Sequence, residues 1–258
     1  MRQRAVRFVL AALAAIALTV VGPDAWAQNT EPAKPEAATA VKIPAALPPD
    51  VAFGRFIALI RGHLLTGDEL VKQRDWSEAH SHFMFPLEEI YGVIREELRT
   101  YKTPPFDGAL KALVHTVAAH NARQYPKALE KVERALAAAD ADLKSRQPDW
   151  PRFVVETAIA VLNTASEEYA DAVVKERMVH PVGYRTARGF ILQADRMIES
   201  AADDLKVRNP DALRDMWAGF AQLKRAFAIV NAPKRSPIDE AAMLGIVSRI
   251  DIAARKLL

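Results

Sequence analysis

The chain contains no cysteine. That absence excludes disulfide bonds, thiolate zinc sites, iron–sulfur clusters and a cysteine nucleophile. Glycine is scarce as well, with 10 residues in 258, as expected for a protein without hairpins. No run of alternating apolar and polar residues predicts a strand. The sequence therefore predicts an all-α protein whose stability depends on its hydrophobic core alone.

Long apolar runs are also lacking, apart from one near the start. Three arginines precede the stretch from Phe8 to Val21, which is apolar except for Thr19, and Ala25-Trp26-Ala27 follows it. This order of charged, apolar and small residues is typical of a secretory signal peptide, here residues 1–27. The run is shorter than the roughly 20 residues of a membrane span, although an uncleaved anchor is the alternative. We expect a periplasmic or secreted protein with no membrane span after cleavage.

A strong charge of one sign is missing too. The whole chain has a formal net charge of +3, and residues 1–27 carry three arginines and one aspartate, which leaves +1 for the remainder. No long basic stripe is present in that remainder. Neither nucleic acid nor an anionic membrane is therefore an implied partner.

Proline-rich segments divide the rest of the chain. Residues 28–47 carry three prolines among Ala, Glu, Lys and Thr, which predicts a disordered tether. Apolar residues at helical spacing then predict eight helical segments. They begin near Val51, Asp75, Phe106, Pro126, Pro151, Pro181, Pro210 and Pro237, and we expect the second to continue past Pro86 to about Tyr101 and the fifth to end near Arg177.

These segments predict two antiparallel four-helix units, a first bundle over residues 48–146 and a second over residues 150–258, which meet near Gln147–Pro151. The two halves are faintly similar, because the sequence LVKQR at 70–74 resembles VVKER at 173–177. An internal duplication is one interpretation. The other is that amphipathic, alanine-rich helices resemble one another in any case.

Sequence motifs that define a reaction are absent. The chain has no glycine-rich phosphate loop, no Gly-x-Ser-x-Gly elbow and no His-Glu-x-x-His. We therefore predict a protein that is not an enzyme.

Histidines and one glutamate on the inner faces of the first three helices suggest a metal site. If these helices run up, down and up, His63, Glu88 and His120 fall at one level of the first bundle, and His80 and His82 lie within about two helical turns of it. Imidazole and carboxylate groups from facing helices are how bundles bind metals. Such a set suits Fe, Zn, Cu or Mn and does not choose among them. His115 points outward and is the natural control.

Three functions remain open at this point. The first is an exported protein that binds a transition-metal ion or a small ligand through the first bundle. The second is an interaction module without a small ligand, whose outer faces dock another protein of the cell envelope; its inward histidines would then only hydrogen-bond their neighbours. The third is a metal-dependent hydrolase, which needs an open coordination position and a base beside the metal.

We predict cleavage after Ala27, because the small residues at 25 and 27 fit the recognition pattern of signal peptidase. Intact-mass analysis of the exported protein measures this directly. A mass that retains residues 1–27 would contradict the prediction and favour the uncleaved anchor.

Overall fold

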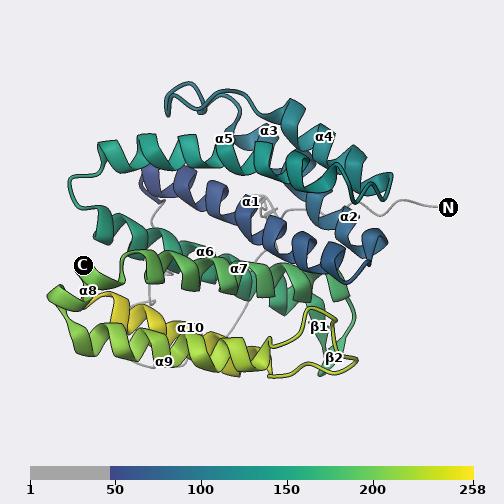
Figure 1. The fold of residues 1–258 in the computed structure, drawn as a ribbon. Coiled ribbons are helices and arrows are strands. Elements are labelled where there is room, and N and C mark those ends of the chain that lie inside the picture. The colour runs from purple at the N-terminus through teal and green to yellow at the C-terminus, as the bar shows by residue number, and fades with distance from the viewer. Residues whose placement is uncertain (1–46) are drawn as a thin grey trace, which may run out of the picture. The chain divides into compact units, whose positions relative to one another are not determined.

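A computed structural model describes residues 47–258 (Figure 1). The predicted signal peptide, and the predicted tether except for Leu47, lie outside the described residues. Over 47–258 the regular structure is helical apart from one short hairpin, which confirms the predicted all-α class. None of the described helices is long and apolar enough to cross a membrane.

The first half of the described chain forms a ring of helices. It consists of α1 (Pro49–Lys72), α2 (Trp76–Phe85), α4 (Asp107–Ala118) and α5 (Tyr125–Arg146). Each helix contacts the next, and α5 returns to contact α1. A π-helical turn, η1 (Pro86–Ile90), and the short α3 (Tyr91–Ile94) continue α2.

The second half forms a ring with the same order of contacts. Its helices are α6 (Trp150–Ala172), α7 (Pro181–Ser200), α9 (Pro210–Ala226) and α10 (Glu240–Ala254), and the short α8 (Ala202–Arg208) leads from α7 into α9. Contacts run from α6 to α7, α9, α10 and back to α6. The two predicted four-helix units are thus present. A duplication, and the independence of residues 48–146 and 150–258 as domains, stay predictions.

Capping side chains explain where four of the described helices begin. The side chains of Asp75, Asp149, Asn209 and Asp239 accept hydrogen bonds from backbone N–H groups in the first turns of α2, α6, α9 and α10. Such caps satisfy N–H groups that have no partner within the helix. The last helix therefore begins at Glu240 behind Asp239, three residues later than Pro237 suggested.

Two predicted helices end early. The fifth was expected to reach Arg177, but α6 stops at Ala172, and β1 (Val173–Val174) and β2 (Arg177–Met178) form a two-stranded hairpin. The second was expected to reach Tyr101, but α3 ends at Ile94 and turns follow. The prediction of no strands was wrong at this hairpin, because strands of two residues are too short to show alternation.

Helix α1 lies at the centre, in contact with α2, α5, α6 and α7 (Figure 1). Its glycines allow three of these neighbours to approach closely. A Cβ atom on Gly54 would lie 2.7 Å from Phe153 of α6, and one on Gly67 would lie 2.5 Å from Phe83 of α2. A Cβ atom on Gly62 would lie 3.2 Å from the backbone oxygen of Gly189 in α7. The two rings therefore meet backbone to backbone.

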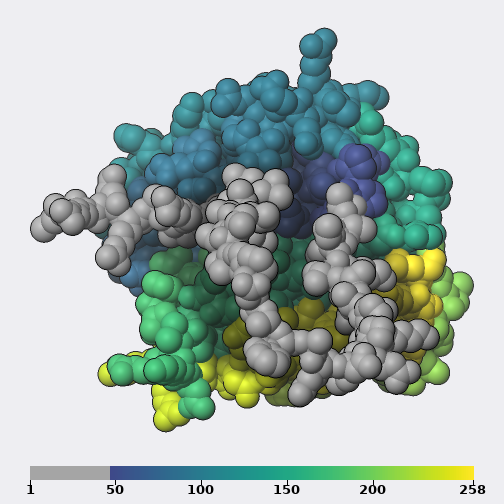
Figure 2. Space-filling view, turned by 180° about the vertical axis from the view of Figure 1, so that it is seen from behind, coloured from purple at the N-terminus to yellow at the C-terminus, as the bar shows by residue number. Residues whose placement is uncertain are grey.

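The rings occupy different parts of the surface. In the space-filling view of Figure 2, the blue residues of the first ring gather at one side and the yellow residues of α10 at the other. The apolar core is nevertheless shared, since buried residues from both rings form one cluster. Among the described residues, α1 makes most of the contacts that join the rings, through α6 and α7, and Glu78 of α2 adds an ion pair with Arg185 of α7.

We predict that Gly189→Ala destabilises the protein by about 1–3 kcal/mol. The new Cβ would lie 2.3 Å from the backbone oxygen of Gly62 and 2.4 Å from Thr66 Oγ1, so α1 and α7 must separate. Denaturant unfolding measures the change in free energy.

Gly92→Ala is the matched control, because nothing lies within 4 Å of its added Cβ. In this helical position alanine should stabilise by up to about 1 kcal/mol. Equal effects of the two substitutions would contradict a tight approach of α1 to α7.

Candidate functional site

Two buried histidines face each other between α1 and α2. Nδ1 of His63 lies 3.4 Å from Nδ1 of His82, and the side chains are 5% and 0% exposed. The ring of His63 also lies 5.5 Å from that of Phe85 and 5.1 Å from that of Phe190 on α7. Two phenylalanine side chains therefore enclose the pair on one side. One of them, Phe190, belongs to the second group of helices.

Both imidazoles are neutral at physiological pH. Burial lowers the pKa of His63 to about 3. Burial also holds the pKa of His82 well below 6.5, and the nearby His63 and the charge of Arg185 lower it further. Two neutral imidazoles can share one proton along the Nδ1–Nδ1 line only if one ring donates and the other accepts. Their separation is longer than the usual 2.9–3.0 Å of a good N–H hydrogen bond.

Helix α7 brings Arg185 to this pair. Its guanidinium forms an ion pair with Glu78 of α2, and its backbone oxygen accepts a hydrogen bond of 3.1 Å from Thr66 Oγ1 on α1. Arg185 is 8% exposed. Its charge is therefore placed inside the interface between the rings and balanced there by one carboxylate.

A second arginine is buried one turn further along α7. Nη1 of Arg188 lies 2.6 Å from Oε2 of Glu69, Nη2 lies 3.2 Å from Oε1, and Nε donates to the backbone oxygen of Phe227 at 2.9 Å. This two-pronged geometry is the strong form of an arginine–carboxylate pair. Arg188 is thus fully engaged and has a structural role.

The hydrogen bonding of Arg185 is incomplete, and so is that of the neighbouring His82. Nε of Arg185 and Nε2 of His82 are both buried without a hydrogen-bond partner among the described residues. Buried polar atoms are nearly always satisfied by protein, water or an ion. Two of these atoms, on Arg185 and His82, belong to this cluster and can accept a further hydrogen-bond partner.

The predicted layer of His63, Glu88 and His120 is not assembled. Among residues 47–258, no three His, Asp or Glu side chains lie close enough to hold a metal ion. Glu88 is exposed and lies in the π-helical turn η1, where Tyr91 bonds to a carbonyl five residues back. The wider turn shifts the helical phase relative to a regular α-helix. The neighbouring Glu89 is exposed as well.

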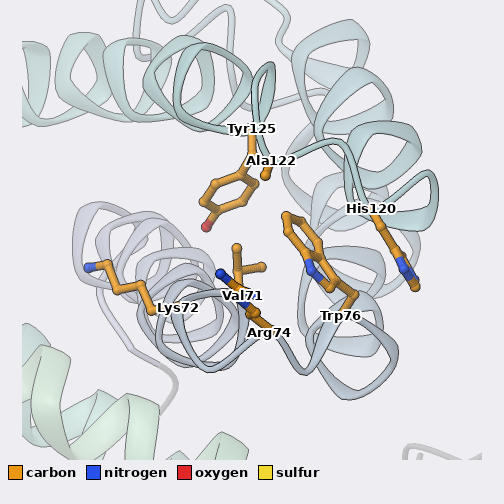
Figure 3. A pocket seen from close by; sticks show the side chains of 7 residues that line it. All are labelled: Val71, Lys72, Arg74, Trp76, His120, Ala122 and Tyr125. Atoms are coloured by element: carbon orange, nitrogen blue, oxygen red, sulfur yellow. The ribbon is translucent and has the colours of Figure 1, made fainter.

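His120 leaves the inner stripe because α4 ends before it. Its φ of 50° and the bonds from His120 N to Val117 O and from Asn121 N to Thr116 O form a Schellman cap. The exposed ring stacks on Trp76 at a centroid distance of 5.7 Å and borders a surface pocket of about 380 Å³ (Figure 3). Figure 3 shows Trp76 between His120 and Tyr125.

The remaining histidines of the prediction are distributed differently. His82 joins His63, although the sequence placed it only near the layer. His80 is half-buried on α2, and His115 is exposed on α4. The structure therefore brings together two of the five candidate ligands.

Sequence reasoning missed the two arginines of α7. They lie three positions apart and so share one helix face, and Arg185-Thr-Ala-Arg-Gly189 surrounds them with small residues. This spacing was a usable signal, because small neighbours let another helix approach closely. Their acidic partners lie more than 100 positions away in the chain and could not be paired from the sequence.

One comparison with known proteins gives a match. Residues 144–258 are similar to the iron permease-associated 4-helix bundle domain. The matched region contains α6, α7, α9 and α10, the four helices of the second ring. No curated protein and no solved structure matches the chain. The matched region includes Arg185 and Arg188.

We predict that acid destabilises the protein through the histidine pair. The folded-state pKa of His63, about 3, lies below the unfolded value of 6.5. The contribution of the neutral His63 to the free energy of unfolding is therefore complete above pH 6.5. It is lost as the pH falls from 6.5 toward 3. From about pH 7.5 to about pH 5, the unfolding free energy should fall by about 2 kcal/mol from His63 alone.

Denaturant unfolding of the double variant His63→Gln/His82→Gln isolates this effect. Its free energy should depend less on pH than that of the wild type, whereas His115→Gln should behave as the wild type does. The same pH slope in the double variant would show that the pair does not stay neutral in the folded protein.

Proposed function

We propose that this chain is a non-enzymatic helical protein of an iron-transport system, exported to the periplasm, which takes up a transition-metal ion between His63 and His82. The metal is cargo in this proposal, not a resident cofactor. The 3.4 Å between the two Nδ1 atoms is the observation that carries it.

That separation fits two ligands of one ion. Two nitrogens about 2.0–2.1 Å from a tetrahedral metal lie about 3.3–3.4 Å apart. The pair needs no rearrangement to reach this distance. Both imidazoles are also already neutral, which is the state that ligates a metal.

The unpartnered nitrogens support the same proposal. When Nδ1 of a histidine ligates a metal, its Nε2 carries the proton and usually donates to an oxygen. Nε2 of His82 and Nε of Arg185 are then two buried donors that a water or an anion oxygen can satisfy. Glu78 balances the charge of Arg185, so the arginine does not leave the site strongly positive.

Two protein ligands make a weak site. Stable zinc sites use three or four protein side chains, whereas here water or a carrier must complete the coordination. Such a site suits an ion that must be released again. The similarity of the second ring to an iron permease-associated domain favours iron as the cargo and a membrane permease as the partner.

Metal titration of the full chain after chelator treatment tests the proposal. Calorimetry with Fe²⁺ under anaerobic conditions, and separately with Zn²⁺ and Cu⁺, should give about one ion per chain. Because both ligands are required, His63→Gln and His82→Gln should each weaken binding by about tenfold or more. Circular dichroism confirms that the variants remain helical.

His120→Gln and His115→Gln are the matched controls, since both side chains are exposed whereas the pair is buried. Both should bind metal as the wild type does. Loss of binding in His120→Gln would instead support the layer of His63, Glu88 and His120 that was predicted from the sequence. A wild type that binds none of the three ions would sink the proposal and favour an interaction module without a small ligand.

A further inference from the structure

A hollow whose lining residues are all cationic lies beside the hairpin of the second ring. Lys175, Arg177, Lys234 and Arg235 surround a pocket of about 440 Å³, and all four residues are exposed. The first two belong to the hairpin of β1 and β2, and the others to the segment between α9 and α10 (Figure 1). This pocket is separate from the histidine pair and does not depend on its function.

Backbone hydrogen bonds hold the two segments side by side. Met178 N donates to Lys234 O at 3.1 Å, and Ser236 N donates to Glu176 O at 3.0 Å. Arg177 and Arg235 form an antiparallel bridge between these bonds. The cations are thus brought together by main-chain pairing, although like charges in direct opposition destabilise a strand pair.

The turn of the hairpin carries backbone strain. Lys175 and Glu176 have φ values of 47° and 61°. Two-residue hairpin turns of this kind usually use Asn-Gly or Gly-Gly, because other residues cost about 1–2 kcal/mol each at positive φ. Strained backbone of this kind clusters at functional sites, and Lys175 is one of the four residues that line the pocket.

Most of the positive charge is not neutralised locally. Glu176 lies 2.5 Å from Nη2 of Arg235. Within residues 47–258, Lys175, Arg177 and Lys234 form no ion pair. Four cations and one carboxylate leave a local charge of about +3, which a ligand of similar negative charge can balance.

We propose that this pocket binds a phosphate-bearing anion. A single carboxylate supplies one negative charge, whereas a phosphate monoester carries about −1.5 to −2 and a diphosphate more. Arginine and lysine together are suited to phosphate oxygens, the former through its two-pronged fork and the latter as a point charge. The size of the pocket lies in the range of small-molecule sites, about 300–1,000 Å³.

Two sources can present this group, a soluble phosphate compound or the headgroup of an anionic lipid. Calorimetry of the full chain with inorganic pyrophosphate tests the first. Sedimentation with phosphatidylcholine vesicles, with and without phosphatidylglycerol, tests the second. We expect binding in at least one arm that weakens as salt is raised, because the charges are exposed.

Charge-neutral variants locate the binding. Lys175→Gln/Lys234→Gln should weaken it by about tenfold or more. Lys127→Gln/Lys131→Gln removes the same charge from the exposed side of α5 and should change binding by less than about twofold. Pocket-dependent binding to pyrophosphate assigns a soluble ligand, and pocket-dependent binding only to phosphatidylglycerol vesicles assigns a lipid headgroup.

Lys175→Gly separates ligand binding from folding. It relieves the positive φ and should raise the melting temperature by about 2–4 °C, while it weakens anion binding. A stabilised variant with unchanged binding would contradict the role of Lys175. Absence of binding in both arms, or equal loss in the pocket and α5 double variants, would overturn the proposal.

Discussion

The close approach of α1 and α7 at Gly62 and Gly189 is the contact on which the interface depends. A Cβ atom on Gly189 would lie 2.3 Å from the backbone oxygen of Gly62, so only glycine lets the helices meet at this distance. The approach brings Thr66 within hydrogen-bond distance of the Arg185 carbonyl. It also places Phe190, on α7 of the second ring of helices, against His63, on α1 of the first. A wider interface would break these contacts and expose the histidine pair.

Charge in this interface is arranged asymmetrically. Arg188 has carboxylate and carbonyl partners for its donors, and its pairing with Glu69 offsets the cost of burying a guanidinium. Arg185 pairs with Glu78 but leaves Nε without a partner, beside a histidine that also lacks one. Fully satisfied groups stabilise a fold, whereas incompletely satisfied ones are a feature of functional sites. Arg188 has a hydrogen-bond partner at every nitrogen, whereas Arg185 does not. The unsatisfied arginine is the one beside the histidine pair, so the candidate site lies there.

The candidate metal site is composite. Its histidines belong to the first ring, whereas Arg185 and Phe190 belong to the second, which is similar to an iron permease-associated domain. A metal bound there would link α1 to α2 within the first ring, and Arg185 of the second ring would lie beside it. The cationic pocket, by contrast, is built from the second ring alone. The two sites differ in charge and burial, and so in the chemistry that each can recognise.

The sequence by itself determined the helical class, the two groups of four helices and most helix starts, because prolines, capping residues and apolar periodicity act locally. It also placed His63 on an inner face and His82 near the same level of the bundle. Only the tertiary structure decided their direct contact and the exposure of Glu88 and His120. A π-helical turn displaced Glu88, and a Schellman cap at the end of α4 displaced His120. Both features depend on backbone geometry, which the periodicity of side chains does not record. The pairing of Arg185 and Arg188 with acids more than 100 positions away was likewise fixed by helix packing, which brings distant residues together without leaving a local pattern.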